Sequence, residues 1–470
     1  MEFLENRTYD EIRIGDQASL VRTLELKDIQ LFAAMSGDIN PAHLDPEYAK
    51  STMFQEVIAH GMWGGALIST VLGTQLPGPG TIYLSQSLQF SKPVTLGDTL
   101  TVTVTAARKY EHHHNVIFDC RCVNQHGVVV ISGTAEVIAP TQKIKRPRLA
   151  LPEVRITDMT SQYRRLIAMA EKPEPISMAV VHPCDRESLL GAVEAARANL
   201  IVPVLVGPRN KIEAVARAEG IDLAPYRIVD APHSHAAAHI AVGMARDGDV
   251  EALMKGSLHT DELMGEVVAP ESGLRTGRRI SHVFIMDLPT YPRMLMITDA
   301  AINIDPTLED KVDIVQNAID LAHVLKVADP KVAILSAVET VTPKLRSTLE
   351  AAALCKMADR GQITGGVLDG PLAFDNAVSM VAAKTKGVVS AVAGRADILL
   401  VPELEAGNMV AKQLEYLADA QAAGIVLGAR VPIVLTSRAD NVQTRLASCA
   451  VALLLARHGG NSPGAADAQK

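Results

Sequence analysis

The sequence predicts two domains of different fold class, an α+β domain followed by an α/β domain, and three observations predict this order. Over residues 1–139, after one helical stretch, apolar and polar residues alternate with period two, as in antiparallel strands with one solvated face. Over residues 161–470, short continuous apolar runs alternate with alanine-rich helical stretches, as in buried parallel strands. The segment 140–160 supplies prolines and charge without periodicity, so we predict a linker there.

Length and composition exclude several classes of protein. A chain of 470 residues, with 48% hydrophobic and 21% charged residues, is of ordinary globular type. The net charge of −8 argues against nucleic acid or an anionic membrane as the main partner. The chain has no long uncharged apolar run and does not start with a signal peptide, so we expect a cytoplasmic location without membrane association. Five cysteines fit no disulfide framework, and we expect free thiols.

The elements of the first domain follow from the alternation. One stretch, 59–70, is apolar nearly all round, as a helix enclosed by a curled sheet must be. We expect strands at 82–90, 99–105, 115–122 and 127–138.

The second domain has a different pattern. Its apolar runs predict buried parallel strands with helices on both faces of the sheet. Because this region is large for one such sheet, we expect two lobes with a cleft between them. The clearest strands are predicted at 177–181, 202–206, 332–335, 398–401 and 433–435.

A carboxylate and an imidazole lie close together near the start of the first domain. Asp38 and His43 flank Asn40-Pro41, where the proline suits the first turn of a short helix. The apolar helix that follows begins near Gly61, whose backbone N–H is among those that a helix leaves unpaired. A capped turn without catalytic function is the competing interpretation of the Asp-x-Asn-Pro run.

These groups suit the addition of water to an enoyl thioester. The reaction needs a base for water, a proton for C2 and stabilisation of the enolate oxygen. Asp38 and His43 can supply the first two. The N–H of Gly61 can supply the third, a contribution of roughly 3–4 kcal/mol in comparable oxyanion holes.

Residues 10–138 resemble the MaoC family of (R)-specific enoyl-CoA hydratases. The resemblance implies a hot-dog fold, a dimer, Asp38 and His43 as the catalytic dyad and Gly61 as the oxyanion contact. It also places Ser69 near the dyad, and we assign Asn40 and Ser69 to substrate binding. Hot-dog folds also include thioesterases, but the Asp38 and His43 pairing favours hydration. The matching segments are 36–45, 59–62, 77–80 and 83–90.

The second candidate site follows a predicted strand near the C-terminus. Ligands of parallel α/β sheets gather beyond the carboxyl ends of strands, and Ser437, Arg438 and Asp440 are delivered there. Arg438 could bind phosphate through a pair of hydrogen bonds from its guanidinium. Taken alone, residues 436–440 could also be the end of a strand followed by a helix cap without catalytic function.

Residues 165–460 are similar to the phosphotransacetylase and phosphotransbutyrylase family. The similarity implies two α/β lobes, dimerisation and reversible acyl transfer between CoA and phosphate, without metal or other cofactor. It implies that Ser437 stabilises the transition state, that Arg438 holds the acyl phosphate and that Arg275 binds anions. Asn408 is assigned to substrate binding. The matching segments are 254–260, 273–282, 298–303, 368–371 and 402–408.

One position departs from the acetyl-specific branch of this family. That branch places a base carboxylate seven residues after the serine, where this chain has Thr444. Asp440 is the nearest substitute, and the Thr-Ser-Arg-Ala-Asp form is closer to the butyryl branch. The acyl chain length is therefore left open.

The sequence thus predicts a bifunctional, homo-oligomeric enzyme of CoA thioesters. Enoyl-CoA would be hydrated to (R)-3-hydroxyacyl-CoA, and acyl-CoA with inorganic phosphate would give acyl phosphate. Alternatively, the second domain is a non-catalytic module that senses acyl-CoA or drives oligomerisation.

Overall fold

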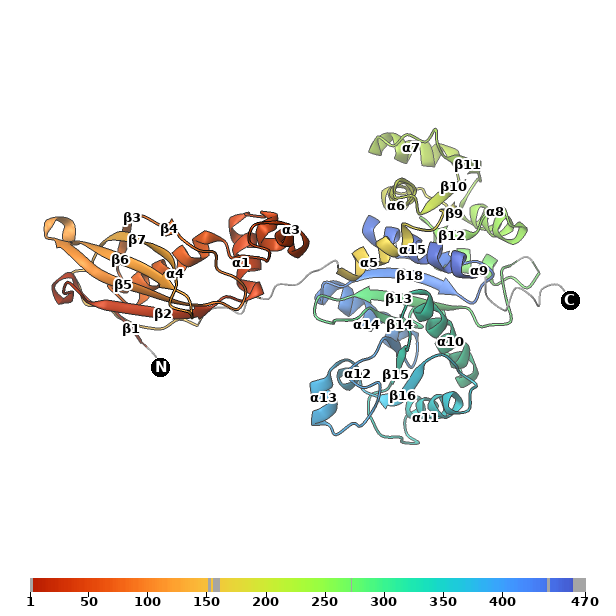
Figure 1. The fold of residues 1–470 in the computed structure, drawn as a ribbon. Helices are drawn as coiled ribbons and strands as arrows, with labels where there is room; N and C mark the ends of the chain where they lie inside the picture. The colour runs from red at the N-terminus through yellow and green to blue at the C-terminus, as the bar shows by residue number, and fades with distance from the viewer. Residues whose placement is uncertain (1–2, 151–153, 155–160, 272, 438–439, 460–470) are drawn as a thin grey trace. The chain divides into compact units, whose positions relative to one another are not determined.

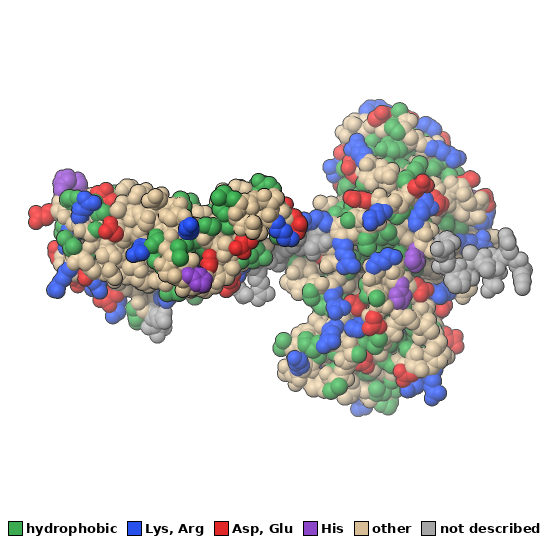
Figure 2. All heavy atoms as spheres, viewed as in Figure 1, with side chains coloured by type: hydrophobic (Ala, Val, Ile, Leu, Met, Phe, Trp, Pro, Cys, Tyr) green, Lys and Arg blue, Asp and Glu red, His purple; other side chains and the backbone are tan. Residues whose placement is uncertain are grey.

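The computed structural model describes residues 3–150, 154, 161–271, 273–437 and 440–459. Contacts divide the chain into two compact units, Met1–Ile156 and Thr157–Lys470, which we describe separately (Figure 1). No helix in the described part is long and apolar enough to cross a membrane. On the face shown in Figure 2, acidic and basic side chains are interspersed over each unit.

Unit 1 is a curled antiparallel sheet packed on one helix (Figure 1). The sheet order is β2-β5-β6-β7-β3, and β4 also pairs with β7. The helix α4 contacts β2 and β5. The predicted hot-dog arrangement is confirmed, and the period-two alternation places buried side chains on one side of β5, β6 and β7. The elements are β2 (Gln17–Thr23), α4 (Gly61–Thr74), β3 (Ile82–Gln86), β4 (Gln89–Phe90), β5 (Thr99–Tyr110), β6 (Asn115–Val123) and β7 (Val129–Ile138).

One apolar face of α4 packs on the sheet, whereas its opposite face is exposed rather than enclosed as the sequence predicted. Trp63, Ile68 and Leu72 are buried in the core of unit 1. Gly64 permits the close approach of helix and sheet, since a Cβ there would lie 2.2 Å from Ile131 Cδ1. The N-terminal end of α4 is left exposed at Gly61, where the candidate site begins.

Three short helices precede α4 and carry the candidate dyad. Helix α1 (Leu26–Ser36) ends at Gly37, whose φ of 75° is left-handed. Helix α2 (Pro41–Leu44) starts with the proline expected there, and α3 (Pro46–Ser51) follows it immediately.

The predicted linker begins too early. Strand β8 (Lys145–Pro147) pairs antiparallel with β1 (Phe3–Glu5), with Leu4 opposite Arg146. Asn6 donates to the Gln142 carbonyl and accepts from the Ile144 N–H, both at 2.9 Å. The first part of the segment 140–160 therefore belongs to unit 1. A three-residue strand is too short to show an alternation, which is why the sequence pattern missed it.

Unit 2 is an α/β unit on one mixed sheet of eleven strands, in the order β11-β10-β9-β12-β19-β18-β13-β14-β17-β15-β16. The two ends of the sheet are parallel, as predicted, whereas β19-β18-β13-β14 is antiparallel. The strands are β9 (Ile176–Val181), β10 (Ile201–Gly207), β11 (Arg227–Asp230), β12 (Ala252–Lys255), β13 (Ser281–Asp287), β14 (Leu295–Thr298), β15 (Lys331–Leu335), β16 (Val367–Leu372), β17 (Ile398–Leu400), β18 (Gln421–Leu427) and β19 (Ile433–Val434).

The expected two lobes correspond to the two parallel ends of this sheet, joined through its antiparallel centre rather than built on separate sheets (Figure 1). The helices are α5 (Ser161–Ala170), α6 (Arg186–Arg197), α7 (Arg209–Glu219), α8 (Ser234–Asp247), α9 (Thr260–Val267), α10 (Leu308–Val324), α11 (Arg346–Asp359), α12 (Phe374–Val378), α13 (Met380–Thr385), α14 (Leu404–Leu417) and α15 (Val442–Gly459).

We expect Ile68→Ala to destabilise unit 1 by about 2–5 kcal/mol, because the side chain is fully buried between α4 and the sheet. Trp63 is the single tryptophan of the chain, so its fluorescence during urea unfolding reports on unit 1 alone. Thr70→Ala, an exposed position of the same helix, is the control. Equal unfolding midpoints for the two variants would contradict the packing described.

Candidate active sites

Asp38 lies on the loop between α1 and α2, and its carboxylate is exposed. The backbone N–H of Asn40 donates to Asp38 Oδ1 (3.2 Å), and the N–H of Asp38 donates to the Ser36 hydroxyl (3.2 Å). These local bonds hold the loop without consuming the second carboxylate oxygen. Asp38 therefore has an oxygen available for a proton or a ligand.

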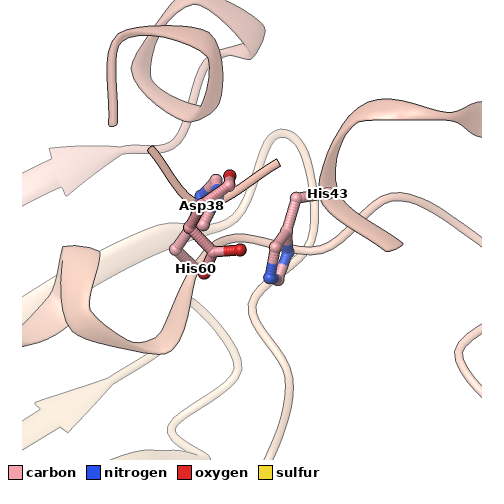
Figure 3. Close-up of side chains that lie close together, drawn as sticks. All are labelled: Asp38, His43 and His60. Carbon is pink, nitrogen blue, oxygen red and sulfur yellow. The ribbon is translucent and has the colours of Figure 1, made fainter. Parts of the chain in front are cut away.

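His43 lies on α2, and its Nδ1 is 2.9 Å from the Ile58 carbonyl. A carbonyl oxygen only accepts, so Nδ1 carries the proton and Nε2 of the neutral ring keeps its lone pair. Figure 3 shows the Asp38 carboxylate pointing toward the His43 ring. The structure thus brings the predicted dyad together, with the imidazole held in the tautomer that can accept a proton.

His60 joins this pair and was not assigned from the sequence. Its side chain is only 2% exposed, and its ring centroid lies 4.0 Å from that of His43. One ligand atom from each of Asp38, His43 and His60 lies within 4.8 Å of the other two. The sequence signal that could have identified His60 is its position directly before Gly61, the glycine that begins the apolar helix.

This group could also hold a metal ion, because two imidazoles and a carboxylate form a common ligand set for zinc or iron. One ring nitrogen of His43 and one of His60 lie within hydrogen-bond distance of backbone carbonyls, which leaves each ring a single nitrogen for coordination. The acid–base chemistry expected from the sequence does not require an ion.

The N-terminus of α4 is where the sequence predicts the oxyanion contact. Gly61 is the first residue of the helix and is exposed, and His60, in the N-cap position, makes no side-chain capping bond. A Cβ at Gly61 would lie 3.0 Å from the Phe90 ring, so the glycine keeps this end of the helix open. The helix end can therefore direct N–H groups toward an oxygen of a bound thioester.

The two substrate-binding residues assigned in unit 1 differ in their placement. Asn40 Oδ1 accepts from the Ala42 N–H (3.1 Å), so in this structure its side chain caps α2. Ser69 is exposed on α4, about 12 Å along the helix axis from Gly61 at 1.5 Å per residue. Among the described residues, no contact joins Ser69 to the dyad.

The second site is a hydrogen-bonded turn after β19. Asp440 Oδ2 accepts from the Ser437 N–H (2.7 Å), and the Asp440 N–H donates to the Ser437 carbonyl (3.2 Å). Asp440 is 4% exposed, and Lys412 Nζ of α14 lies 3.6 Å from its Oδ1. The structure thus joins two of the three predicted catalytic residues. Arg438 lies outside the described residues.

Two buried cations, Lys255 and Arg445, border this turn. Lys255 ends β12, which runs parallel to β19, so the carboxyl ends of both strands lie at the same sheet edge. Arg445 is fully buried and donates to the carbonyls of Ser437 (3.1 Å) and Lys255 (3.3 Å). Burial lowers the pKa of the Arg445 guanidinium, while Asp185 and Asp440 act in the opposite direction.

His282 of β13 is a third buried polar group near the turn. It is fully buried, and its Nε2 donates to the Leu435 carbonyl (3.2 Å). Burial lowers the pKa of His282, while the nearby carboxylates of Asp299 and Asp440 oppose this. Sequence reasoning assigned no role to Lys255, His282 or Arg445, because their meeting at this turn depends on long-range contacts that no sequence spacing reveals.

Arg275 and Asn408 are not brought to Ser437 by any contact of the described residues. Arg275 is exposed and forms an isolated backbone bridge with Ala429, before β19, whereas Ser437 follows that strand. The Asn408 side-chain amide of α14 donates to the Ala300 carbonyl (3.2 Å). The roles assigned to these two residues remain predictions.

Known proteins match the two units separately. The family described as "Phosphate acetyl/butaryl transferase" matches residues 234–453, and the family described as "MaoC like domain" matches residues 14–119. A phosphate acetyltransferase from Rhizobium meliloti is 65% identical over 63% of this chain and 94% of the relative. A phosphate butyryltransferase from Clostridium acetobutylicum is 42% identical over 63% and 99%. The chain therefore belongs to the phosphate acetyl/butyryltransferase family and carries a MaoC-like domain at its N-terminus.

Two solved structures are also similar. A branched-chain phosphotransacylase from Enterococcus faecalis V583 is 28% identical, with a TM-score of 0.53 over 60% of this chain and 99% of that one. The R-hydratase PhaJ1 from Pseudomonas aeruginosa is 45% identical over 33% of this chain and 99% of that one, with a TM-score of 0.32.

We expect the stability of unit 2 to fall as the pH drops below about 6.5, the ordinary pKa of histidine. Burial lowers the pKa of His282 in the folded state, so the unfolded chain binds the proton first. The stabilisation is fully present above pH 6.5 and is lost as the pH falls toward the lower folded pKa.

The check is chemical denaturation at several pH values, followed by far-UV circular dichroism. His282→Gln retains an N–H donor but does not titrate. Its free energy of unfolding should fall less steeply as the pH drops, with a difference in slope of up to about 1.4 kcal/mol per pH unit. Parallel stability curves for the two proteins would exclude His282 as the cause. His323→Gln, at a half-buried histidine whose Nε2 lies 2.7 Å from the Gly365 carbonyl, is the control.

Proposed function

We propose that unit 2 transfers an acyl group between CoA and phosphate, and that the acyl group is acetyl. The observation that carries this proposal is the 65% identity to a phosphate acetyltransferase across nearly its whole length. The phosphate butyryltransferase is more distant, at 42% identity. The short motif around Ser437 favoured the butyryl branch, but it is outweighed by identity over about 300 residues.

In the direction of thioester formation, the CoA sulfur attacks the acyl carbon and the carbon–oxygen bond to phosphate breaks. The thiol loses its proton to a base and inorganic phosphate leaves. Ser437 is proposed to donate to the oxygen that becomes negative. Lys255 and Arg445 place two cationic side chains at this strand edge, which suits a phosphate group.

Asp440 is the proposed base for the thiol proton. Its Oδ2 is held by the Ser437 N–H, whereas its buried Oδ1 has no hydrogen-bond partner among the described residues. Thr444, at the position of the usual base, has no acidic group. The alternative of a non-catalytic sensing module is not supported, because Ser437 and Asp440 share one hydrogen-bonded turn and the named relatives are transferases.

We propose that unit 1 hydrates 2-enoyl-CoA to (R)-3-hydroxyacyl-CoA. Support comes from the MaoC-like match and from the placement of Asp38 and His43 beside the open end of α4. Water attacks C3, the dyad takes a proton from that water, and the dyad returns a proton to C2, so both groups are restored after each turnover. The Gly61 N–H is proposed to stabilise the enolate oxygen.

A homo-oligomer remains part of the proposal. In unit 1, β3 is at the edge of the sheet and carries exposed apolar side chains, Ile82 and Leu84 among them. An edge strand of this composition favours pairing with another chain. Light scattering coupled to size exclusion would show a mass above that of one chain.

We expect Asp38→Asn and His43→Gln to lower kcat for crotonyl-CoA hydration by about 10²–10⁴-fold, because each removes one member of the acid–base pair. Loss of the conjugated enoyl absorbance measures the reaction. Acyl transfer in unit 2 should be unchanged. Asp45→Asn, between α2 and α3, is the matched control, since asparagine can replace the aspartate that caps α3. Hydration at the normal rate by both dyad variants would refute the assignment.

We expect Asp440→Asn to lower kcat for thioester formation from acetyl phosphate and CoA by about 10²-fold, because the amide keeps an oxygen for the Ser437 N–H but cannot accept the thiol proton. Hydration should be unaffected. Asp419→Asn, at an exposed position, is the control. A fully active Asp440→Asn enzyme would mean that another group is the base. Replacing acetyl by butyryl phosphate in the same assay tests the acyl group.

A further inference from the structure

We infer that His60 is a positioning residue of the proposed hydratase. It ties the Asp38 loop, the His43 ring and the start of α4 to one another. The inference rests on the hydration proposed for unit 1 and adds to it a residue that neither the sequence reasoning nor the dyad mechanism uses.

The first contact fixes the Asp38 loop. His60 Nε2 lies 3.0 Å from the Asp38 backbone carbonyl, which can only accept, so the ring N–H donates. The two residues are 22 positions apart, and this bond joins an exposed loop to a side chain that is almost fully buried. The loop that carries the carboxylate is thereby anchored to the core of unit 1.

The second contact orients the His43 ring. The rings of His43 and His60 are 4.0 Å apart between centroids, with their planes tilted by 34°. On α1, Phe32 lies 5.0 Å from the His60 ring, at the same tilt. His60 thus has an aromatic neighbour on α1 and another on α2. The bond from His43 Nδ1 to the Ile58 carbonyl fixes the ring edge, and the His60 ring fixes its face.

The third relation is through the chain. His60 is the residue directly before Gly61, and although it occupies the N-cap position its side chain makes no capping bond. The histidine side chain is therefore not explained by stabilisation of α4, for which Ser, Thr, Asp or Asn would serve better. A displacement of His60 would instead move the Gly61 N–H relative to the dyad.

One atom of His60 has a cost that packing alone does not explain. Its Nδ1 is buried and has no hydrogen-bond partner among the described residues. A buried polar atom without a hydrogen bond destabilises a fold, and a plain aromatic ring would avoid this cost. We attribute the presence of a histidine here to its N–H, which holds the Asp38 loop, and to its planar ring, which also contacts His43.

Three substitutions separate the two contacts. His60→Phe keeps the ring but removes the donor, His60→Gln keeps a donor but removes the ring, and His60→Ala removes both. We expect kcat for crotonyl-CoA hydration to fall about 10-fold for Phe and for Gln and about 10²-fold for Ala, since small misplacements of reacting groups have effects of this size. KM should change little, because His60 is too buried to bind substrate. His126→Ala, at an exposed histidine, is the control.

Folding is checked independently of hydration. Trp63 fluorescence reports whether unit 1 is folded in each variant, and acyl transfer by unit 2 gives the concentration of active chain. Partial recovery by Phe and Gln relative to Ala, with native Trp63 fluorescence, supports the inference. A normal kcat in folded His60→Ala overturns it, as does a change confined to KM. If the unsubstituted protein does not hydrate crotonyl-CoA, the proposed function fails and this inference fails with it.

Discussion

Hydrogen bonds from buried side chains to backbone carbonyls hold the loops of both candidate sites in place. In unit 1, His60 donates to the carbonyl of Asp38, and in unit 2, Arg445 donates to the carbonyl of Ser437. A carbonyl belongs to the main chain, so each bond fixes the path of the loop and leaves the reactive side chain free to meet a substrate. The same bonds satisfy polar groups that would otherwise be costly to bury. The path of the main chain at each site therefore depends on a buried side chain from outside the loop itself.

Sequence patterns predicted the features that repeat or that form a contiguous motif. The alternation in unit 1 gave four strand segments, and the apolar runs of unit 2 marked five strands, all observed at or near the expected residues. The segment 82–90 is divided into β3 and β4, and β19 is parallel to β12 but antiparallel to β18. Asp38, His43 and Gly61 were found because a proline and a glycine-rich helix mark their surroundings. These signals are local, so they can be recognised without knowing which elements pack together.

Features that depend on long-range contact were not predicted. No sequence motif marks His282 or Arg445 for this site, and only the folded chain shows that they meet the Ser437 turn. The antiparallel centre of the large sheet has the same apolar runs as its parallel ends, so strand direction could not be read from them. The bond between His60 and Asp38 spans 22 residues and follows no spacing rule.

The pairing of β1 with β8 places the incoming and outgoing strands of unit 1 next to each other. A folded body whose two ends meet can be attached to, or removed from, a longer polypeptide without distortion of its own interior. The only covalent requirement for joining it to another domain is a connecting segment. Evolution could therefore assemble such a two-part protein by joining genes, with little need for either part to readjust.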